Sequence, residues 1–276
     1  MDRRIAFVTG ASRGIGAATS LALAERGFDV VVTARTLREG EGPERGADGK
    51  PIAGSLETTA AGIRERGREA LTLRLDLLDS ESIEAAVVET EKRWGPVEVL
   101  VNNGIYQGDG TMAHVLDLEV EEFERLYRGN VTAPVFLAQR VLPGMLAMRR
   151  GGIVNLVSEA GMTNPRAPAG QGGWGFAYAS SKAALQRLVG VLTAEHPDCG
   201  LRFVNVQPGF TITESMRARG IRDQFEMRGA PPEACAEVIA WLVTDPRGAE
   251  WQGRSVHSQK LCEELGLLPD WPPPAE

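Results

Sequence analysis

The sequence predicts an α/β fold, a doubly wound parallel sheet with helices on both faces. Short apolar runs of strand character alternate with longer amphipathic stretches of helical periodicity, and this alternation is typical of parallel sheets built from strand–helix–strand units. The first apolar run passes through a glycine-rich turn directly into a helical stretch. A length of 276 residues suits one such unit with a large core, so we expect a single domain over residues 1–276.

The expected elements follow from these runs in order. Strands are predicted at residues 5–9, 29–34, 70–75, 97–101, 153–158, 201–207 and 254–258. Helices are predicted at residues 17–26, 82–94, 119–149 and 178–196, with a short one at 260–268. The run at 5–9 is almost wholly apolar, which is typical of a parallel strand covered on both faces. We find no internal repeat and no linker between domains.

Composition narrows the function classes. The formal net charge of −7 argues against a nucleic-acid surface. The three cysteines, Cys199, Cys235 and Cys262, show neither Cys-x-x-Cys nor Cys/His ligand spacing, so we expect free thiols in a reducing compartment and no metal site. We find no signal-peptide core and expect no membrane span. These features favour a cytoplasmic protein.

A glycine-rich turn follows the first predicted strand. Gly10, Gly14 and Gly16 have the spacing Gly-x-x-x-Gly-x-Gly, which differs from the Gly-x-Gly-x-x-Gly of the long dinucleotide fingerprint. Glycines here allow a tight turn and close approach of the backbone to a pyrophosphate, and the next helix start offers free N–H groups. A purely structural turn is the alternative. The strand before it and the helix after it favour phosphate binding.

A tyrosine and a lysine lie one helical turn apart in the stretch Tyr178-Ala179-Ser180-Ser181-Lys182. Residues at i and i+4 share a helix face. A phenol has a pKa near 10 and exchanges protons poorly at neutral pH, whereas a nearby cation lowers that pKa toward the working range. Such pairs are common on solvated helices, so the pair alone is weak evidence for catalysis. The phosphate-binding turn at the other end of the chain strengthens this interpretation.

Together the two motifs resemble the short-chain dehydrogenase/reductase family. The resemblance runs from residue 5 to about residue 213. It implies a catalytic tetrad of Asn130, Ser158, Tyr178 and Lys182, a Rossmann-like sheet of about seven strands in the order 3-2-1-4-5-6-7, and ligands at the carboxyl ends of the strands. The family's helices at Asn130 and Tyr178 commonly pair, so we expect a homodimer or homotetramer.

The resemblance also implies a nicotinamide dinucleotide along these strand ends. The residues that we expect to bind it are Gly10, Ser12, Arg13, Gly14, Ile15, Gly16, Arg35, Thr36, Asp76, Leu77, Asn103, Gly104, Tyr178, Lys182, Pro208, Gly209 and Thr213. Asp76 matches the family's acid that hydrogen-bonds the adenine; capping the following helix is the alternative role.

The end of the second strand predicts which dinucleotide binds. An NAD enzyme places an acid there to accept a hydrogen bond from the ribose 2′-OH. This chain has Ala34 followed by Arg35, and a guanidinium pairs with a 2′-phosphate through two hydrogen bonds. Arg13 can approach the same phosphate. With two arginines and no competing acid in the pattern, we expect NADP(H) to be preferred, with NAD(H) possible.

The reaction implied is hydride transfer between the nicotinamide and a ketone or secondary alcohol. Tyr178 would be the acid or base, Ser158 would polarise the carbonyl, and Lys182 would lower the pKa of Tyr178 and bind the nicotinamide ribose. Pro134, four residues after Asn130, cannot return an N–H to the Asn130 carbonyl. That oxygen would then hold a water that relays protons; a simple helix kink is the alternative.

The chain departs from the family pattern in several places. The Asn-Asn-Gly step at 102–104 is followed by Ile105, and the residues at 253–258 replace the usual Asp-Gly-Gly, which puts the usual tetramer contact in doubt. An insertion at 37–55 is either a solvated loop or a flap near the adenosine end. A second insertion, 163–176, holds Trp174, which either lines the pocket with Met162 or pins the loop.

Residues from about 210 to 230 are expected to form a substrate cover. Loop sequence does not report pocket shape, so the substrate, the physiological direction and the tail's role stay open. Two other functions compete with the reductase: a non-catalytic NADP(H)-binding regulator on the same fold, and a sugar-nucleotide epimerase or dehydratase. The latter relatives tend to carry Gly-x-x-Gly-x-x-Gly, which this chain lacks.

Overall fold

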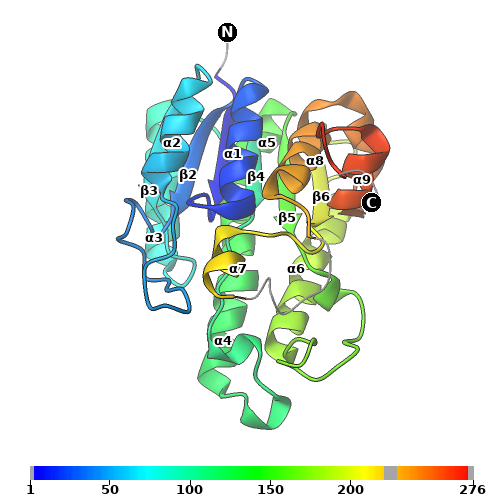
Figure 1. The fold of residues 1–276 in the computed structure, drawn as a ribbon. Coiled ribbons are helices and arrows are strands. Elements are labelled where there is room, and N and C mark those ends of the chain that lie inside the picture. Colours follow the sequence, from blue (N-terminus) through cyan, green and yellow to red (C-terminus); the bar gives the residue numbers. More distant parts are fainter. Residues whose placement is uncertain (1–2, 221–228, 273–276) are drawn as a thin grey trace.

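One seven-stranded parallel sheet forms the centre of the protein (Figure 1). The computed structural model describes residues 3–220 and 229–272. The strand order is β3-β2-β1-β4-β5-β6-β7, which confirms the order implied by the resemblance. The strands are β1 (Ile5–Thr9), β2 (Asp29–Ala34), β3 (Ala70–Arg74), β4 (Val99–Asn102), β5 (Gly152–Leu156), β6 (Arg202–Gln207) and β7 (Ser255–His257).

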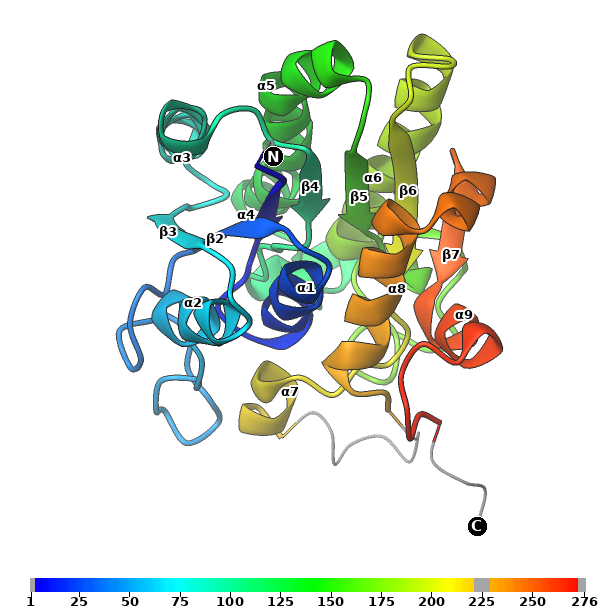
Figure 2. The same ribbon diagram turned by 90° about the horizontal axis from the view of Figure 1, so that it is seen from above.

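Helices cover both faces of this sheet, as Figure 2 shows from above. One face carries α1 (Gly14–Glu25), α2 (Leu56–Glu65), α8 (Pro232–Thr244) and α9 (Ser258–Leu265). The other carries α3 (Ser80–Trp94), α5 (Ala133–Met148) and α6 (Phe176–Glu195). Two shorter helices, α4 (Val120–Tyr127) and α7 (Glu214–Ala218), lie beyond the carboxyl ends of the strands (Figure 1). The α/β class with helices on both faces is confirmed.

Most predicted boundaries lie within three residues of the observed ones. Strand β5 ends at Leu156 and not at residue 158, because Ser158 caps a short turn at Glu159–Gly161 and its hydroxyl accepts from the Ala160 N–H (3.2 Å). Helix α1 begins at Gly14, three residues before the predicted start, because the glycine-rich turn passes directly into the helix. The chain therefore turns sharply at the carboxyl ends of β1 and β5.

The stretch predicted as one helix at 119–149 is interrupted. Between α4 and α5 the backbone widens into a π-helical segment, Arg128–Thr132, and Asn130 lies within it. Such i→i+5 turns occur often at functional sites. The segment lies just before Pro134, whose missing N–H prevents an ordinary helical hydrogen bond there.

The same helical run corrects the expectation that no stretch approaches a membrane span. By length and composition, Val120–Met148 is long and apolar enough to cross one, since an 18-residue window within it has a mean hydropathy of 1.3. Its apolar side chains instead pack onto the sheet: Leu137, Val141 and Met145 are buried in the core beneath α5. The apolar character thus reflects a helix of the protein core.

Candidate active site

A cavity of about 440 Å³ lies at the carboxyl ends of the strands. All the residues predicted to bind the dinucleotide line it, from Gly10 at the first turn to Thr213 before α7. Of the predicted tetrad, Tyr178 and Lys182 line it as well, whereas Ser158 and Asn130 are not among its lining residues. Parallel register brings these segments together, because the ends of β1, β4, β5 and β6 lie side by side.

The glycine-rich turn forms a cradle that only glycine fits. A Cβ on Gly16 would lie 2.2 Å from the Gly10 carbonyl oxygen, and one on Gly10 (φ +65°) would lie 2.7 Å from the Cα of Gly104. The Asn103 amide donates to the Thr9 carbonyl (2.8 Å) and so ties the turns after β1 and β4 together. The start of α1 faces the cavity, and N–H groups at such a helix start suit a pyrophosphate.

Tyr178 presents its hydroxyl beside Ser158. It lies in the first turn of α6, and the two hydroxyls are hydrogen-bonded. Burial raises the pKa of the Tyr178 phenol, and the hydrogen bond with Ser158 opposes this rise. Burial therefore favours the protonated phenol, whereas the Tyr–Lys spacing predicted a phenol with a lowered pKa.

Lys182 is fully buried one turn further along α6. Its ammonium donates a 2.7 Å hydrogen bond to the Leu156 carbonyl at the end of β5. Burial lowers the pKa of Lys182 to about 8, so the side chain is mostly cationic at neutral pH. No carboxylate among the described residues pairs with this ammonium. A buried cation held by one carbonyl is suited to stabilise negative charge that develops nearby.

The Asn130 side chain is buried and hydrogen-bonds the backbone of the segment after β4. Its side-chain oxygen accepts from the Tyr106 N–H (2.8 Å), and its amide donates to the Tyr106 carbonyl (3.2 Å). The same amide contacts the Ser181 hydroxyl on α6 (3.4 Å). The side chain thus links the segment after β4 to the helix that carries Tyr178 and Lys182.

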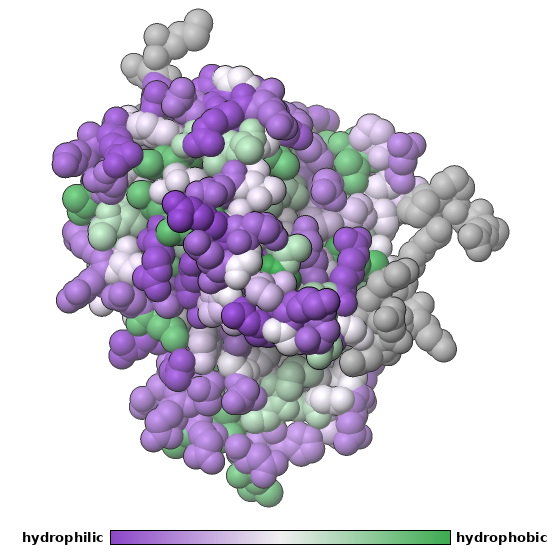
Figure 3. Space-filling model, turned by 60° about the vertical axis from the view of Figure 1, so that its left-hand side comes forward, coloured by the Kyte–Doolittle hydropathy of each residue, from purple (hydrophilic) through white to green (hydrophobic). Residues whose placement is uncertain are grey.

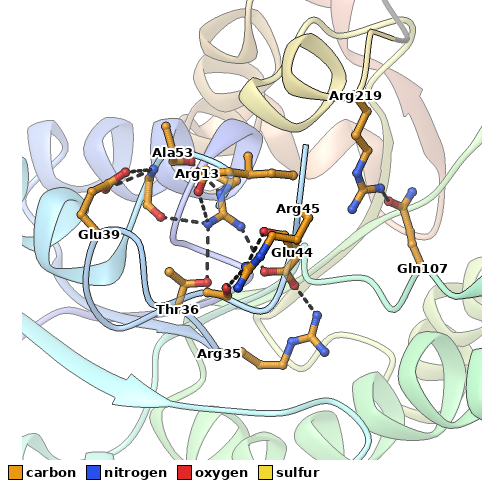
Figure 4. Close-up of polar contacts among 12 residues, drawn as sticks. Arg13, Arg35, Thr36, Glu39, Glu44, Arg45, Ala53, Gln107 and Arg219 are labelled. Atoms are coloured by element: carbon orange, nitrogen blue, oxygen red, sulfur yellow. Dashed lines mark hydrogen bonds and ion pairs between the residues drawn. The ribbon is translucent and has the colours of Figure 1, made fainter. Parts of the chain in front are cut away.

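The end of the cavity where the sequence predicts the adenosine is built around two arginines (Figure 4). Arg13 donates to the carbonyls of residues 52, 53 and 54 at distances of 2.8–3.2 Å, so most of its guanidinium holds the 37–55 segment in place. Arg35 extends from the end of β2 and is a third exposed (34%). Of the two arginines predicted to bind the 2′-phosphate, Arg35 therefore makes fewer hydrogen bonds to the backbone.

The end of β2 has no acid in its own sequence, but the 37–55 insertion places one beside Arg35. Glu44 lines the cavity, pairs with Arg35, and places its second oxygen 3.6 Å from an Arg13 nitrogen (Figure 4). Although burial opposes it, the two guanidiniums lower the pKa of the Glu44 carboxyl and hold it as an anion. The expectation of no competing acid is therefore wrong: sequence reasoning looked for it at the strand end, and the chain supplies it ten residues later.

The alternative role expected of Asp76 is also wrong. Asp79 caps α3 by accepting from the N–H groups of Glu81 and Ser82. Asp76 lines the cavity and accepts from the Leu78 N–H (3.0 Å). It is thus placed at the cavity and does not cap the helix.

A second acid that sequence reasoning missed lies at the start of α1. Glu214, the first residue of α7, accepts a 2.9 Å hydrogen bond from the Gly14 N–H. Thr213 caps α7 and its methyl group packs against Gly14. Only part of the expected substrate cover is described, since residues 221–228 lie outside the described residues; in the described part, Arg219 contacts Gln107 (3.3 Å).

The second insertion, 163–176, lies beside the region after β4. The Gly175 N–H donates to Thr111 (3.2 Å), and His114 contacts the Ala169 carbonyl (3.1 Å). Trp174 is half-buried, and Met162 is 40% exposed. Neither side chain lines the 440 Å³ cavity, and the loop is held by the Gly175 and His114 contacts.

Comparison with known proteins agrees with this geometry. The model of the short chain dehydrogenase family matches residues 4–47 and 50–223. The chain is 30% identical over 260 residues to a 3-oxoacyl-[acyl-carrier-protein] reductase of Synechocystis sp., covering 92% of this chain and 95% of that one. It is 32% identical over 250 residues to a cis-4-hydroxycyclohexanecarboxylate dehydrogenase of Sinomonas cyclohexanicum, covering 88% and 90%.

Solved structures show the same architecture. A short-chain type dehydrogenase/reductase from Mycobacterium marinum has a TM-score of 0.75 at 25% identity and covers 93% of this chain and 94% of its own. The fold and the cavity define an NAD(P)-dependent oxidoreductase. More specifically, the chain belongs to the short-chain dehydrogenase/reductase family.

Proposed function

We propose that this protein is an NADP(H)-dependent oxidoreductase that interconverts a ketone and a secondary alcohol. The observation that carries the proposal is Tyr178, whose hydroxyl bonds Ser158 while the buried Lys182 lies one turn away at the same cavity. When bound, the dinucleotide supplies or accepts the hydride at its nicotinamide ring. The glycine cradle, Asn103 and Lys182 are suited to hold it.

Each catalytic side chain has a distinct proposed task. In reduction, the Tyr178 hydroxyl donates its proton to the oxygen of the carbonyl substrate. Ser158 donates a hydrogen bond to the same oxygen and stabilises its growing negative charge. Lys182 stabilises the phenolate that Tyr178 becomes, which is how it lowers the effective pKa of a phenol that burial alone holds high.

Asn130 is proposed to support proton supply. Its side chain fixes the Tyr106 backbone, and its carbonyl lies in a π-helical turn ahead of Pro134. A water held at that carbonyl would connect Lys182 with solvent. The side-chain contact to Ser181 keeps the π-helical segment close to α6.

The proposed preference for NADP(H) rests on Arg35 and Arg13, whose two positive charges exceed the single negative charge of Glu44 beside them, and on Ala34, which leaves the end of β2 without an acid. A 2′-phosphate that meets two guanidiniums is favoured. We also propose a single catalytic domain that works in the cytoplasm, where the cysteines, which are free, stay reduced.

A self-associating surface is proposed near α4. Val115, Leu116 and Val120 are 65–98% exposed. On the face drawn in Figure 3, hydrophilic residues predominate and hydrophobic ones are scattered, a few of them at the end where Figure 1 places α4. Exposed apolar residues near the helices of Asn130 and Tyr178 suit a homodimer or homotetramer.

A substrate panel tests the proposed function. Purified protein is assayed for NADPH and NADH oxidation with 3-oxoacyl thioesters, steroid-like ketones and small xenobiotic carbonyls, and dinucleotide binding is measured in parallel. We expect turnover of at least one ketone class, faster with NADPH. Binding without turnover on every class would favour the non-catalytic regulator.

A further inference from the structure

Two carboxylates of this chain occupy the anion-binding positions of the cavity. Glu44, from the 37–55 segment, lies between Arg35 and Arg13, and Glu214, from α7, lies on the Gly14 N–H. The first position is where the 2′ substituent of a dinucleotide is read, and the second is the helix start that suits its pyrophosphate. We propose that Glu44 and Glu214 are internal counter-ions that compete with the phosphates of NADP(H) and that coenzyme binding displaces them.

The charges around Glu44 favour its role as a displaceable counter-ion over a role as acceptor for the ribose 2′-OH. An acid that selects NAD(H) repels a phosphate because it leaves its surroundings negative. Here two guanidiniums face one carboxylate, so the position stays positive and attracts a 2′-phosphate once Glu44 moves away. A 2′-phosphate brings more charge and more acceptor oxygens than a carboxylate.

The pairing of Glu44 is also incomplete. Its second oxygen is buried without a hydrogen-bond donor, because the Arg13 nitrogen lies 3.6 Å away. Arg13 instead directs its other nitrogens to the carbonyls of residues 52–54. Burying an acceptor without a partner costs free energy, and this weakens the hold of the site on Glu44.

The segment around Glu44 lies outside the sheet and has little regular structure of its own. Between β2 and α2 it contains only one isolated bridge, Arg45 with Pro51. The Ala47 N–H donates to the Ala218 carbonyl of α7 (2.8 Å). The two carboxylate-bearing segments therefore contact each other through their backbones.

The inference rests on the proposed dinucleotide binding, and calorimetric titration of NADPH and NADH tests it. We compare wild type with Glu44→Gln, Glu44→Ala and Glu214→Gln. Glu41→Gln is the control, because it removes the same charge from the same segment at a residue that faces solvent and pairs only with Arg38 (3.8 Å).

The two acids should act differently on the two coenzymes. Both Glu44 variants should bind NADPH about threefold to tenfold more tightly, with NADH little changed, since only NADPH competes for the arginines. Glu214→Gln should tighten NADPH and NADH alike, by about twofold to fivefold, because both carry the pyrophosphate. Glu41→Gln should match wild type.

Other outcomes overturn the inference. Weaker NADH binding in the Glu44 variants would make Glu44 a 2′-OH acceptor, and unchanged or weaker NADPH binding in both would make it a structural residue. If Glu214→Gln binds NADPH and NADH with the same affinities as wild type, Glu214 does not compete with the pyrophosphate. Failure of wild type to bind either dinucleotide would instead refute the proposed function.

Discussion

The two ends of the cavity are built from different kinds of structure. At the nicotinamide end, Tyr178 and Lys182 lie on α6, a regular helix of 20 residues, and Lys182 is tied to the last residue of β5. At the adenosine end, Arg13 and Glu44 belong to a turn and an irregular segment. The first end is buried and fixed by regular elements, whereas the second is partly exposed and held by side-chain pairing. The proposed proton transfer is thus assigned to the end fixed by regular elements, and the proposed exchange of coenzyme to the end held by side-chain pairing.

Loss of Ser158 should have a larger effect on turnover than any change at the adenosine end. Ser158→Ala removes the hydroxyl that bonds Tyr178 and that would donate to the substrate oxygen. We expect kcat for ketone reduction to fall about 10²- to 10³-fold, as for removal of an oxyanion donor, with NADPH affinity retained. Steady-state kinetics and a binding titration check this. A fall confined to coenzyme affinity would contradict it.

The pH dependence of reduction should follow Lys182. Below about pH 8 its ammonium is protonated and can stabilise the Tyr178 phenolate; above that value the charge is lost, so kcat for reduction should fall as pH rises through about 8. Lys182→Arg keeps a cation at all these values and should lack this fall, although its maximal rate is lower. Rate profiles from pH 6 to 10 for both proteins test the assignment.

Reversing the charge at the adenosine end should change coenzyme choice. Arg35→Asp replaces the donor paired with Glu44 by a second carboxylate, which repels a 2′-phosphate. We expect NADPH to bind about tenfold or more weakly, with selectivity shifted toward NAD(H). Unchanged selectivity would refute the role of Arg35. Arg38→Asp, a change at an exposed arginine of the same segment, is the matched control.

The smallest expected effect concerns Pro134. Pro134→Ala restores an N–H that can bond the Asn130 carbonyl, and it should narrow the π-helical segment Arg128–Thr132. Reduction should slow by about twofold to fivefold, and the solvent isotope effect on kcat should change, because the relayed proton is less readily supplied. If both stay as in wild type, the turn serves helix packing alone.

Sequence patterns predicted the regular end of this molecule well. Apolar runs place β1 and β2 at their observed residues, and the Tyr-x-x-x-Lys spacing on α6 needs only helical geometry to bring both groups to one face. The glycine turn could be predicted because steric demands at Gly10 and Gly16 leave no other residue possible. These features depend on local periodicity or close backbone contact, which short patterns record.

The irregular end could not be predicted in the same way. The segment that contains Glu44 also contains Glu39 and Glu41 and has no periodic pattern. Which of these acids contacts Arg35 depends on how the loop folds, and the sequence pattern does not show this. Glu214 contacts a residue 200 positions away, a pairing that no local spacing reveals. The pKa of Tyr178 also depends on burial, which raises it, and the Tyr–Lys spacing does not report how deeply the phenol is buried.

Tyr178→Phe is the sharpest test of the proposed proton donor, because it removes one hydroxyl and leaves the ring in place. Ketone reduction and NADPH binding are measured on the same preparation. We predict that kcat falls about 10²- to 10⁴-fold while the NADPH affinity stays within about twofold of wild type. Full turnover by the phenylalanine variant would refute the role of Tyr178, since the proton would then come from another group.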